Sequence, residues 1–228
     1  MSSPREPFVP MLGPALRFPA ATSASRHGLV AVGGDLSVAR LLLAYRSGIF
    51  PWSAEPITWW SPDPRAVFNL DDFHVPRSLA RLLRRQPFRF TSDRCFRHVV
   101  EECGRVPRGG DSTWITPAII EAYVDLHRAG WAHSLEVWEG DRLAGGIYGV
   151  AIGGFFAGES MFHHVSNASK AALVVLLAGL RDAGFTLFDT QMLTDTTRAI
   201  GAVEIPRSKY LERLADALPR TVSWPAWT

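Results

Sequence analysis

The sequence predicts an α+β fold, in one large domain or two smaller ones. Apolar residues over His133–Trp138, Leu143–Ile152 and the stretch that begins at Phe155 predict three consecutive strands. The apolar run Ala171–Leu180 then predicts a buried helix, and Phe185–Leu193 predicts a further strand. This β-β-β-α-β order, in 228 residues with 47% hydrophobic and 20% charged content, is typical of a globular chain with a full core.

Short elements are expected in the N-terminal part of the chain. Met1–Leu16 contains Pro and Ser without periodicity, which indicates a loose leader. Leu29–Val32 predicts a short strand before a Gly-Gly-Asp turn. Val38–Ser47 has an apolar side and predicts a helix, with Ser37 as its N-terminal cap and Gly48 at its C-terminal end.

Three tryptophans, Trp52, Trp59 and Trp60, stand among prolines within nine residues. Two interpretations are open. Tryptophan is highly buried on average, so the three belong to a core; or they form a flat aromatic surface on which a nucleic-acid base stacks.

A basic segment follows in residues 77–108. It contains nine arginines and three acidic residues, while the whole chain carries a net charge of only +2. The helix expected at Ser78–Arg85 has a leucine face and an arginine face. The arginine face consists of Arg77, Arg81, Arg84 and Arg85. It indicates either a polyanionic partner or a helix face that is only solvated.

The remaining elements are read from local signals. Thr116 and Pro117 are expected to open a helix that Gly130 closes. The other expectations are a strand at Phe88–Phe90, a helix at Asp93–Cys103, a mobile loop at Gly104–Asp111, irregular chain at Ala199–Tyr210 and a helix at Leu211–Leu218.

Acidic and amide side chains end two of the predicted strands. Alternation puts Phe185, Leu187, Asp189 and Gln191 on one face, and Glu159 follows the apolar start of the strand from Phe155. One helical crossover joins these strands, so we expect them to be neighbours whose polar ends share an apolar pocket. The alternative is that Glu159 and Asp189 cap loops or pair with Arg.

Several classes of protein are disfavoured by composition. The longest uncharged apolar run, Leu143–Gly158, is too short for a membrane span and contains six glycines. The N-terminus lacks the pattern of a signal peptide, so a cytoplasmic protein without a membrane partner is expected. Cys95 and Cys103 have no metal-ligand spacing, and we expect neither a metal nor a disulfide.

The predicted meander, helix and strand resemble the GNAT (acyl-CoA N-acyltransferase) fold. That fold holds the pyrophosphate of coenzyme A in a glycine-rich turn at a helix start. Here Val165–Lys170 stands at that place and has no Q/R-x-x-G-x-G/A run. The architecture is therefore expected without coenzyme A.

Eight short strings carry a more specific resemblance, which extends from about Phe18 to Leu214. They are G-G-D-L-S (33–37), G-I-F-P-W (48–52), W-W-S-P-D-P-R-A (59–66), T-W-I-T (113–116), H-S-x-E-V-W (133–138), G-E-S-M-F (158–162), A-S-K (168–170) and E-I-P-R (204–207). In this order they resemble the bacterial leucyl/phenylalanyl-tRNA–protein transferases.

The resemblance implies an enzyme that moves Leu or Phe from its tRNA to the N-terminal amine of a protein beginning with Arg or Lys. The product would be an N-degron for ATP-dependent proteolysis. The implied partners are Leu-tRNA, Phe-tRNA and the acceptor protein, with no cofactor. Two other functions stay open: a GNAT-like acyl-CoA acyltransferase and a non-catalytic RNA-binding module.

The resemblance also implies a small N-terminal α/β domain, residues 1–64, packed on a GNAT-like C-terminal domain, residues 65–228, with site residues in both. Asp189, Gln191 and Glu159 match catalytic positions, and Trp52 and Trp114 match residues that hold the aminoacyl-tRNA end. The expected pocket for the transferred side chain consists of Ile147, Phe156, Met161, Leu173, Leu176 and Phe188. The arginine face within residues 77–85 is expected to contact tRNA phosphates.

The sequence departs from the family pattern in a few places. Ala157 and Thr190 stand where many members have Cys, so thiol catalysis is not expected. His163–Val165 replaces a stretch in which an Arg is common, and the usual His is absent from Thr194–Arg198.

Overall fold

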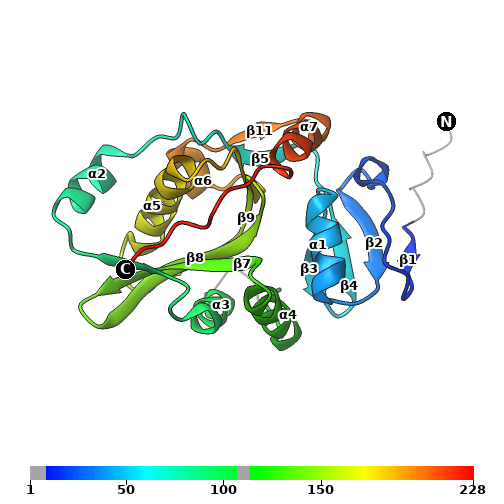
Figure 1. Ribbon diagram of the computed structural model, residues 1–228, viewed down its shortest axis with the longest axis horizontal. Coiled ribbons are helices and arrows are strands. Elements are labelled where there is room, and N and C mark those ends of the chain that lie inside the picture. Colours follow the sequence, from blue (N-terminus) through cyan, green and yellow to red (C-terminus); the bar gives the residue numbers. More distant parts are fainter. Residues whose placement is uncertain (1–8, 107–112) are drawn as a thin grey trace.

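Two β-sheets organise the chain in a computed structural model that describes residues 9–106 and 113–228 (Figure 1). The smaller sheet has the order β1-β2-β4-β3. Its strands are β1 (Met11–Leu12), β2 (Leu29–Gly33), β3 (Phe50–Ala54) and β4 (Ile57–Trp60), and the helix α1 (Val38–Arg46) packs against β3. β1 pairs parallel to β2, so the expectation of a loose leader is wrong for Met11–Leu12; residues 1–8 lie outside the described chain.

The larger sheet has seven strands in the order β11-β5-β10-β9-β8-β7-β6. They are β5 (Arg65–Phe68), β6 (Arg89–Ser92), β7 (Ala132–Glu139), β8 (Arg142–Ile152), β9 (Phe155–His163), β10 (Leu187–Gln191) and β11 (Val203–Ile205). β9 and β10 are adjacent and parallel, as the helical crossover predicts, and every other pair in this sheet is antiparallel.

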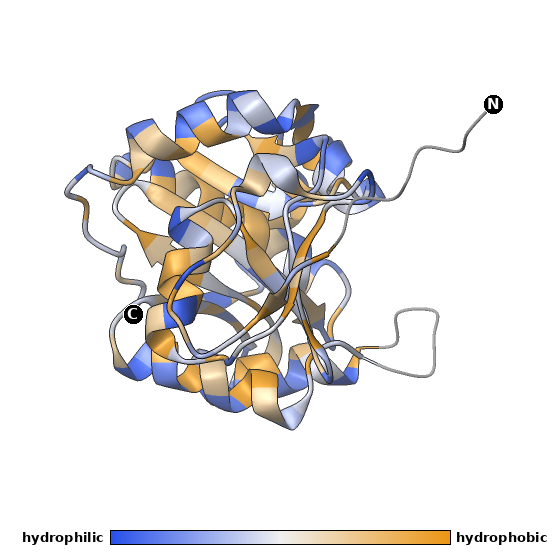
Figure 2. Cartoon of the chain, turned by 90° about the vertical axis from the view of Figure 1, so that its right-hand side faces the viewer, coloured by the Kyte–Doolittle hydropathy of each residue, from blue (hydrophilic) through white to orange (hydrophobic). Residues whose placement is uncertain are grey.

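Helices cover both faces of the larger sheet (Figure 1). α5 (Ala168–Asp182) packs on one face with α2 (Arg77–Arg84) beside it, while α3 (Phe96–Arg105) and α4 (Pro117–Arg128) pack on the other. The chain ends with α6 (Asp195–Ile200) and α7 (Arg207–Ala217), which flank β11. Apolar residues gather along the strands and on the sheet-facing sides of the helices (Figure 2), so each face of the sheet has its own apolar core.

Local signals set the N-termini of α1 and α4 where the sequence predicts them, whereas α3 begins at Phe96 and not at Asp93. Ser37 Oγ accepts a hydrogen bond from the backbone N–H of Arg40, and Thr116 Oγ1 accepts one from Ile119, so both predicted caps are confirmed. Gly48 follows α1 with φ +73°, a left-handed conformation that glycine adopts without steric cost.

The segment Ala199–Tyr210 differs from its prediction as irregular chain. It holds β11, which pairs with β5 over three residues, and the first turn of α7. A strand of three residues has no readable period, and it forms because the edge of β5 offers it backbone partners. Most of the predicted mobile loop at Gly104–Asp111 lies outside the described residues.

The predicted domain boundary falls between the two sheets. β4 ends at Trp60 and β5 begins at Arg65. One cluster of apolar side chains nevertheless runs from Trp59 in the small sheet to Val67 and Phe155 in the large one. The structure thus shows a mixed α/β fold, and the division into two domains stays a prediction. Within the described residues, none of the helices combines the length and apolar character that crossing a membrane requires.

Candidate active site

Two cavities meet at the end of β10 and beside the middle of β9, where Glu159 lies; the expectation that Glu159 ends its strand is wrong, because β9 continues to His163. The larger, the tryptophan cavity, has a volume of about 940 Å³ and lies between the β3–β4 hairpin, the start of α4 and the end of β10. The smaller, the apolar cavity, has a volume of about 480 Å³ and lies over β8, β9 and α5. The residues that line both are Glu159, Thr190, Gln191, Met192 and Thr194. These residues therefore form the junction between the two spaces.

The tryptophan cavity contains both tryptophans that the sequence singled out for tRNA. Trp52 on β3 and Trp114 before α4 line it, and both are partly exposed. Trp59 is different: it is fully buried, and its indole N–H donates to the Gly33 carbonyl at 2.8 Å. The core interpretation is therefore confirmed for Trp59, and stacking of a base on Trp52 stays a prediction.

The apolar cavity contains four of the six residues predicted for the side-chain pocket. They are Ile147, Met161, Leu173 and Phe188. Phe156 and Leu176 are fully buried and line neither cavity. Phe156 instead packs against Phe188, with ring centroids 5.1 Å apart, and supports the cavity wall from behind.

A β-bulge aims Gln191 into the junction. Asp189 pairs with Val67 and Gln191 pairs with Ala66, so the register shifts between them. Gln191 has φ +57°, which a non-glycine residue rarely adopts, and its N–H donates to Asp189 Oδ1 at 2.8 Å. The predicted alternation ends here, because bulges redirect side chains at the end of a ladder.

Asp189 lies behind the junction and has no exposed surface. Its carboxylate accepts hydrogen bonds from Arg65 Nε at 2.9 Å and Arg65 Nη2 at 2.6 Å, and from the Tyr210 hydroxyl at 2.9 Å. Burial acts to lower the pKa of Arg65, but Asp189 and Tyr210 raise it above its ordinary value, so Arg65 stays charged. Asp189 therefore has the Arg partner of the alternative interpretation, and the structure does not place it in the pocket.

Glu159 is held by two phenols and one amide. Tyr45 donates to Oε1 at 2.8 Å, Tyr123 donates to Oε2 at 2.9 Å, and Gln191 Nε2 donates to Oε1 at 3.3 Å. The two phenol oxygens also lie within hydrogen-bond distance of each other, so one phenol shares its single proton between Glu159 and the other phenol. Burial of the carboxyl raises the pKa of Glu159 to about 7, although the two tyrosine hydrogen bonds act to lower it. A group with this pKa changes charge near neutral pH.

Sequence reasoning missed Arg65, Tyr45, Tyr123 and Tyr210. All four are buried polar side chains that hold the predicted site residues. Arg65 had a signal, because it stands within one of the family strings, W-W-S-P-D-P-R-A. The tyrosines had none, since a tyrosine on a helix face has the pattern of an ordinary core residue.

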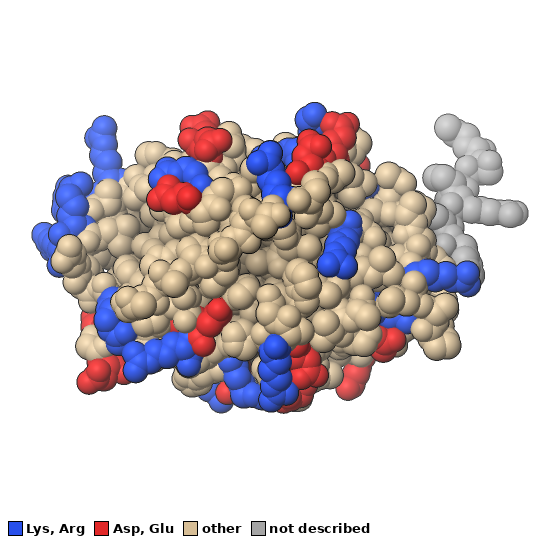
Figure 3. Space-filling model, in the orientation of Figure 1, with Lys and Arg blue, Asp and Glu red and all other residues tan. Residues whose placement is uncertain are grey.

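The arginine face of α2 lies away from the two cavities. Its members Arg77, Arg81, Arg84 and Arg85 are exposed and make no ion pair with the described residues. Figure 3 shows basic side chains at the left edge of the molecule, where Figure 1 places α2. Arg97 and Arg105 of the same basic segment pair with Glu121 and Glu102, so the unpaired charge is concentrated on α2.

Comparison with known proteins gives matches over nearly the whole chain. Residues 67–215 match the family model described as leucyl/phenylalanyl-tRNA protein transferase, and residues 34–63 match the model of its N-terminal domain. A transferase of this description from Magnetococcus marinus is 52% identical over 92% of each chain. One from Anaeromyxobacter sp. (strain K) is 50% identical over 98% of this chain and 94% of its own.

Solved structures resemble the chain only weakly. L-PGS from Bacillus licheniformis matches 68% of this chain and 50% of its own with a TM-score of 0.40 and 16% identity. Similarity at this level does not assign a fold family.

The family matches assign the chain to an enzyme class, the aminoacyltransferases. At about 50% identity over most of its length, it belongs to the leucyl/phenylalanyl-tRNA–protein transferase family.

Proposed function

We propose that the junction of the two cavities is where an aminoacyl ester meets the N-terminal amine of an acceptor protein. One observation carries the proposal: Glu159 and Gln191 stand on the wall shared by an aromatic space and an apolar space. The aromatic space suits the terminal adenosine of a tRNA, stacked on Trp52 and Trp114. The apolar space suits the side chain of the Leu or Phe that the tRNA carries.

The reaction is attack of the neutral amine nitrogen on the ester carbonyl carbon. A C–N bond forms, and the bond between that carbon and the ribose oxygen breaks. The acceptor ammonium releases one proton before attack, and the amine releases a second one that neutralises the leaving ribose oxygen. Because the ester is already activated and an N-terminal amine has a pKa of about 7.7–8.0, the step needs neither ATP nor a cofactor.

Gln191 is the residue that we place nearest to the reacting groups. One of its amide N–H groups is bound to Glu159, which fixes the direction of the side chain. The amide oxygen then accepts from the amine, and the second N–H donates to the developing oxyanion. Glu159 attracts the cationic amine, whereas Asp189 acts as a positioning residue through its bond to the Gln191 backbone.

The acceptors that fit the tryptophan cavity are cationic, which favours proteins beginning with Arg or Lys. Its described lining carries two acidic side chains, Glu55 and Glu159, and no Lys, Arg or His. Glu55 is exposed at the rim on the β3–β4 hairpin. Acidic side chains lower the electrostatic energy of an approaching cation. A neutral competitor gains no such stabilisation.

The apolar cavity selects the transferred residue by shape. Phe188, Met161, Leu173 and Ile147 give this cavity an apolar wall on which Leu and Phe both fit. The rest of its lining includes polar side chains, namely Ser160, Thr196, Thr197 and the junction residues Glu159, Thr190, Gln191 and Thr194. A branched Cβ meets the mouth near the junction. Because one methylene changes apolar binding by only about 1–3 kcal/mol, rejection of Val and Ile is partial.

The body of the tRNA binds through phosphates on Arg77, Arg81, Arg84 and Arg85. These contacts are salt-sensitive and tolerate any sequence. We assign this function to a small domain, residues 1–64, on a GNAT-like domain, residues 65–228. Coenzyme A is not a ligand in this proposal, and the product is a cytoplasmic N-degron for ATP-dependent proteolysis.

The test is transfer of labelled Phe from Phe-tRNA to a protein that begins with Arg. Label on the α-amine of that protein, and none after acetylation of its N-terminus, is the expected result. Incorporation of labelled acetyl from acetyl-CoA favours the acyl-CoA acyltransferase instead. RNA binding without either transfer favours the non-catalytic module.

A further inference from the structure

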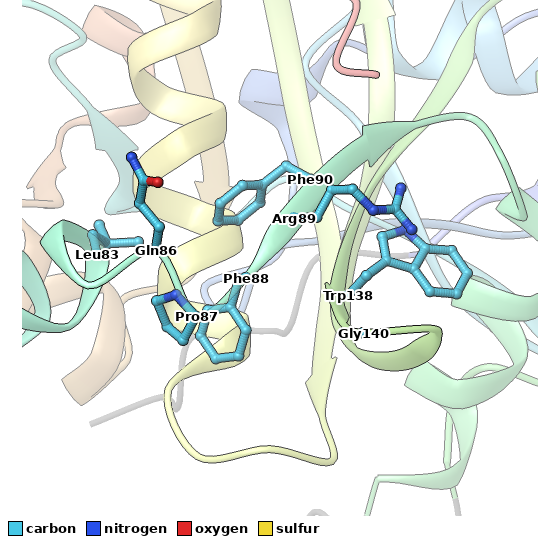
Figure 4. Close-up of a pocket in the computed structure, with 8 residues that line it drawn as sticks. All are labelled: Leu83, Gln86, Pro87, Phe88, Arg89, Phe90, Trp138 and Gly140. Carbon is cyan, nitrogen blue, oxygen red and sulfur yellow. The ribbon is translucent and has the colours of Figure 1, made fainter.

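A third cavity, the α2 cavity, lies between the end of α2 and the turn that joins β7 to β8 (Figure 4). Its volume is about 570 Å³, and it shares no residue with the two cavities of the candidate active site. The residues that line it are Leu83, Gln86, Pro87, Phe88, Arg89, Phe90, Trp138 and Gly140. No part of the proposed transfer reaction uses these residues.

The walls of this cavity are aromatic and cationic. The Arg89 guanidinium lies 5.5 Å from the centroid of the Trp138 ring, and the Arg94 guanidinium lies 5.3 Å from it. Figure 4 shows the Arg89 side chain reaching to Trp138, with Pro87 and Phe88 together on the other side. Aromatic rings and guanidinium planes are the two surfaces on which unstacked RNA bases stack.

Gln86 supplies a hydrogen-bonding edge at the rim. It follows α2 with φ +50°, is exposed, and its side-chain amide makes no hydrogen bond within the described residues. A primary amide both donates and accepts, as the edge of a base requires. The lining contains no acidic residue; Glu139 and Asp141 flank Gly140 in the turn, and Arg142 follows them.

The charge around the cavity indicates RNA as the occupant. The arginine face of α2 leads directly to Gln86, and its four arginines have no acidic partner among the described residues. A chain of phosphates along this face brings the attached bases to the cavity. We propose that the α2 cavity takes an unpaired base of the tRNA whose phosphates lie on α2, an inference that rests on the proposed function for the identity of the RNA.

The experiment compares two RNA probes of equal phosphate number: Phe-tRNA, which has unpaired bases, and a blunt duplex, which has none. Phe88→Leu keeps the apolar volume but removes the stacking face, and Gln86→Ala removes the amide from an exposed position. We expect about tenfold weaker tRNA binding for Phe88→Leu, a smaller loss for Gln86→Ala, and no change for the duplex. The slope of log affinity against log salt stays unchanged for both variants.

Two controls make the result specific. Arg81→Ala should weaken both probes and reduce the salt slope by about one, because it removes a phosphate contact. Phe73→Leu alters another half-buried phenylalanine, which lies beneath the Arg181 guanidinium and outside the α2 cavity, and should leave both affinities unchanged. Equal losses on tRNA and duplex, or wild-type binding by Phe88→Leu and Gln86→Ala, would overturn the inference.

The outcome is separable from that of the proposed function. If wild-type protein transfers Phe while Phe88→Leu and Gln86→Ala bind tRNA normally, the inference about the α2 cavity fails alone. If tRNA binding changes as expected but wild-type protein transfers no Phe, the proposed function fails alone.

Discussion

Arg65 and Asp189 form a bidentate ion pair with essentially no exposure, with N···O distances of 2.9 and 2.6 Å between residues 124 positions apart. The pair joins β5 to β10 at the base of the bulge that presents Gln191. Asp189 Oδ1 also accepts the Gln191 N–H. The buried pair thus fixes the backbone that carries the proposed catalytic amide.

Asp189→Asn should destabilise the protein strongly. The variant leaves the Arg65 charge buried without its counter-charge, which costs about 3–5 kcal/mol of unfolding free energy. Urea denaturation measures this. The matched control is Glu121→Gln, which breaks the exposed Arg97–Glu121 pair and should cost less than about 1 kcal/mol. Similar losses for the two variants would contradict the stabilising role of the buried pair.

Glu159→Gln should change how stability depends on pH. Burial raises the pKa of Glu159 from 4.5 to about 7, so between these values the folded protein keeps a proton that the unfolded chain releases. The contribution of Glu159 to stability therefore falls as pH rises through this window and is constant above it. The stability of Glu159→Gln relative to wild type should rise over the same window. Unfolding at several pH values tests this, and a constant difference would contradict it.

Glu55→Lys should lower transfer to cationic acceptors. The variant places a positive charge at the rim of the tryptophan cavity, where we propose that Glu55 attracts the acceptor. We expect a loss of about five- to tenfold in kcat/KM for an Arg-starting peptide and a much smaller loss for a citrulline-starting peptide. Glu204→Lys, at an exposed position on β11, is the control. Equal losses for both peptides would show that Glu55 does not sense acceptor charge.

Gly158→Ala should shift the preference from Phe toward Leu. A Cβ at this position would stand 2.9 and 3.0 Å from two ring carbons of Phe188, and both residues line the apolar cavity. The Phe188 ring must move, and the added methyl group narrows the cavity. The Phe carried by the tRNA is larger than Leu and therefore loses more binding energy. The ratio of kcat/KM for Phe-tRNA to that for Leu-tRNA measures this. An unchanged or higher ratio would argue against this cavity as the side-chain pocket.

The sequence predicts the parts of the site whose signal is local. Apolar runs and one helical crossover place β9 beside β10, and the structure confirms their parallel pairing. Tertiary contacts decide the rest. No residue from Phe185 to Gln191 predicts the bulge, so alternation puts Asp189 in the pocket. In the structure the Asp189 carboxylate instead pairs with Arg65 behind the junction.

Other omissions have the same cause. The Tyr45–Glu159 bond joins residues 114 positions apart, and no local pattern records it. β11 is too short to show a period and depends on the edge of β5. Phe156 and Leu176 are apolar, as pocket residues are expected to be, but both are fully buried in the core.

The most direct test of the central claim is the single-turnover rate of Phe transfer to an Arg-starting peptide by Gln191→Ala, with both substrates saturating. Gln191 stands at the junction of the two cavities and is bound to Glu159. If amine and ester meet there, the rate falls by about a hundredfold or more, while the affinity for Phe-tRNA changes little. A rate within about twofold of wild type would contradict the account.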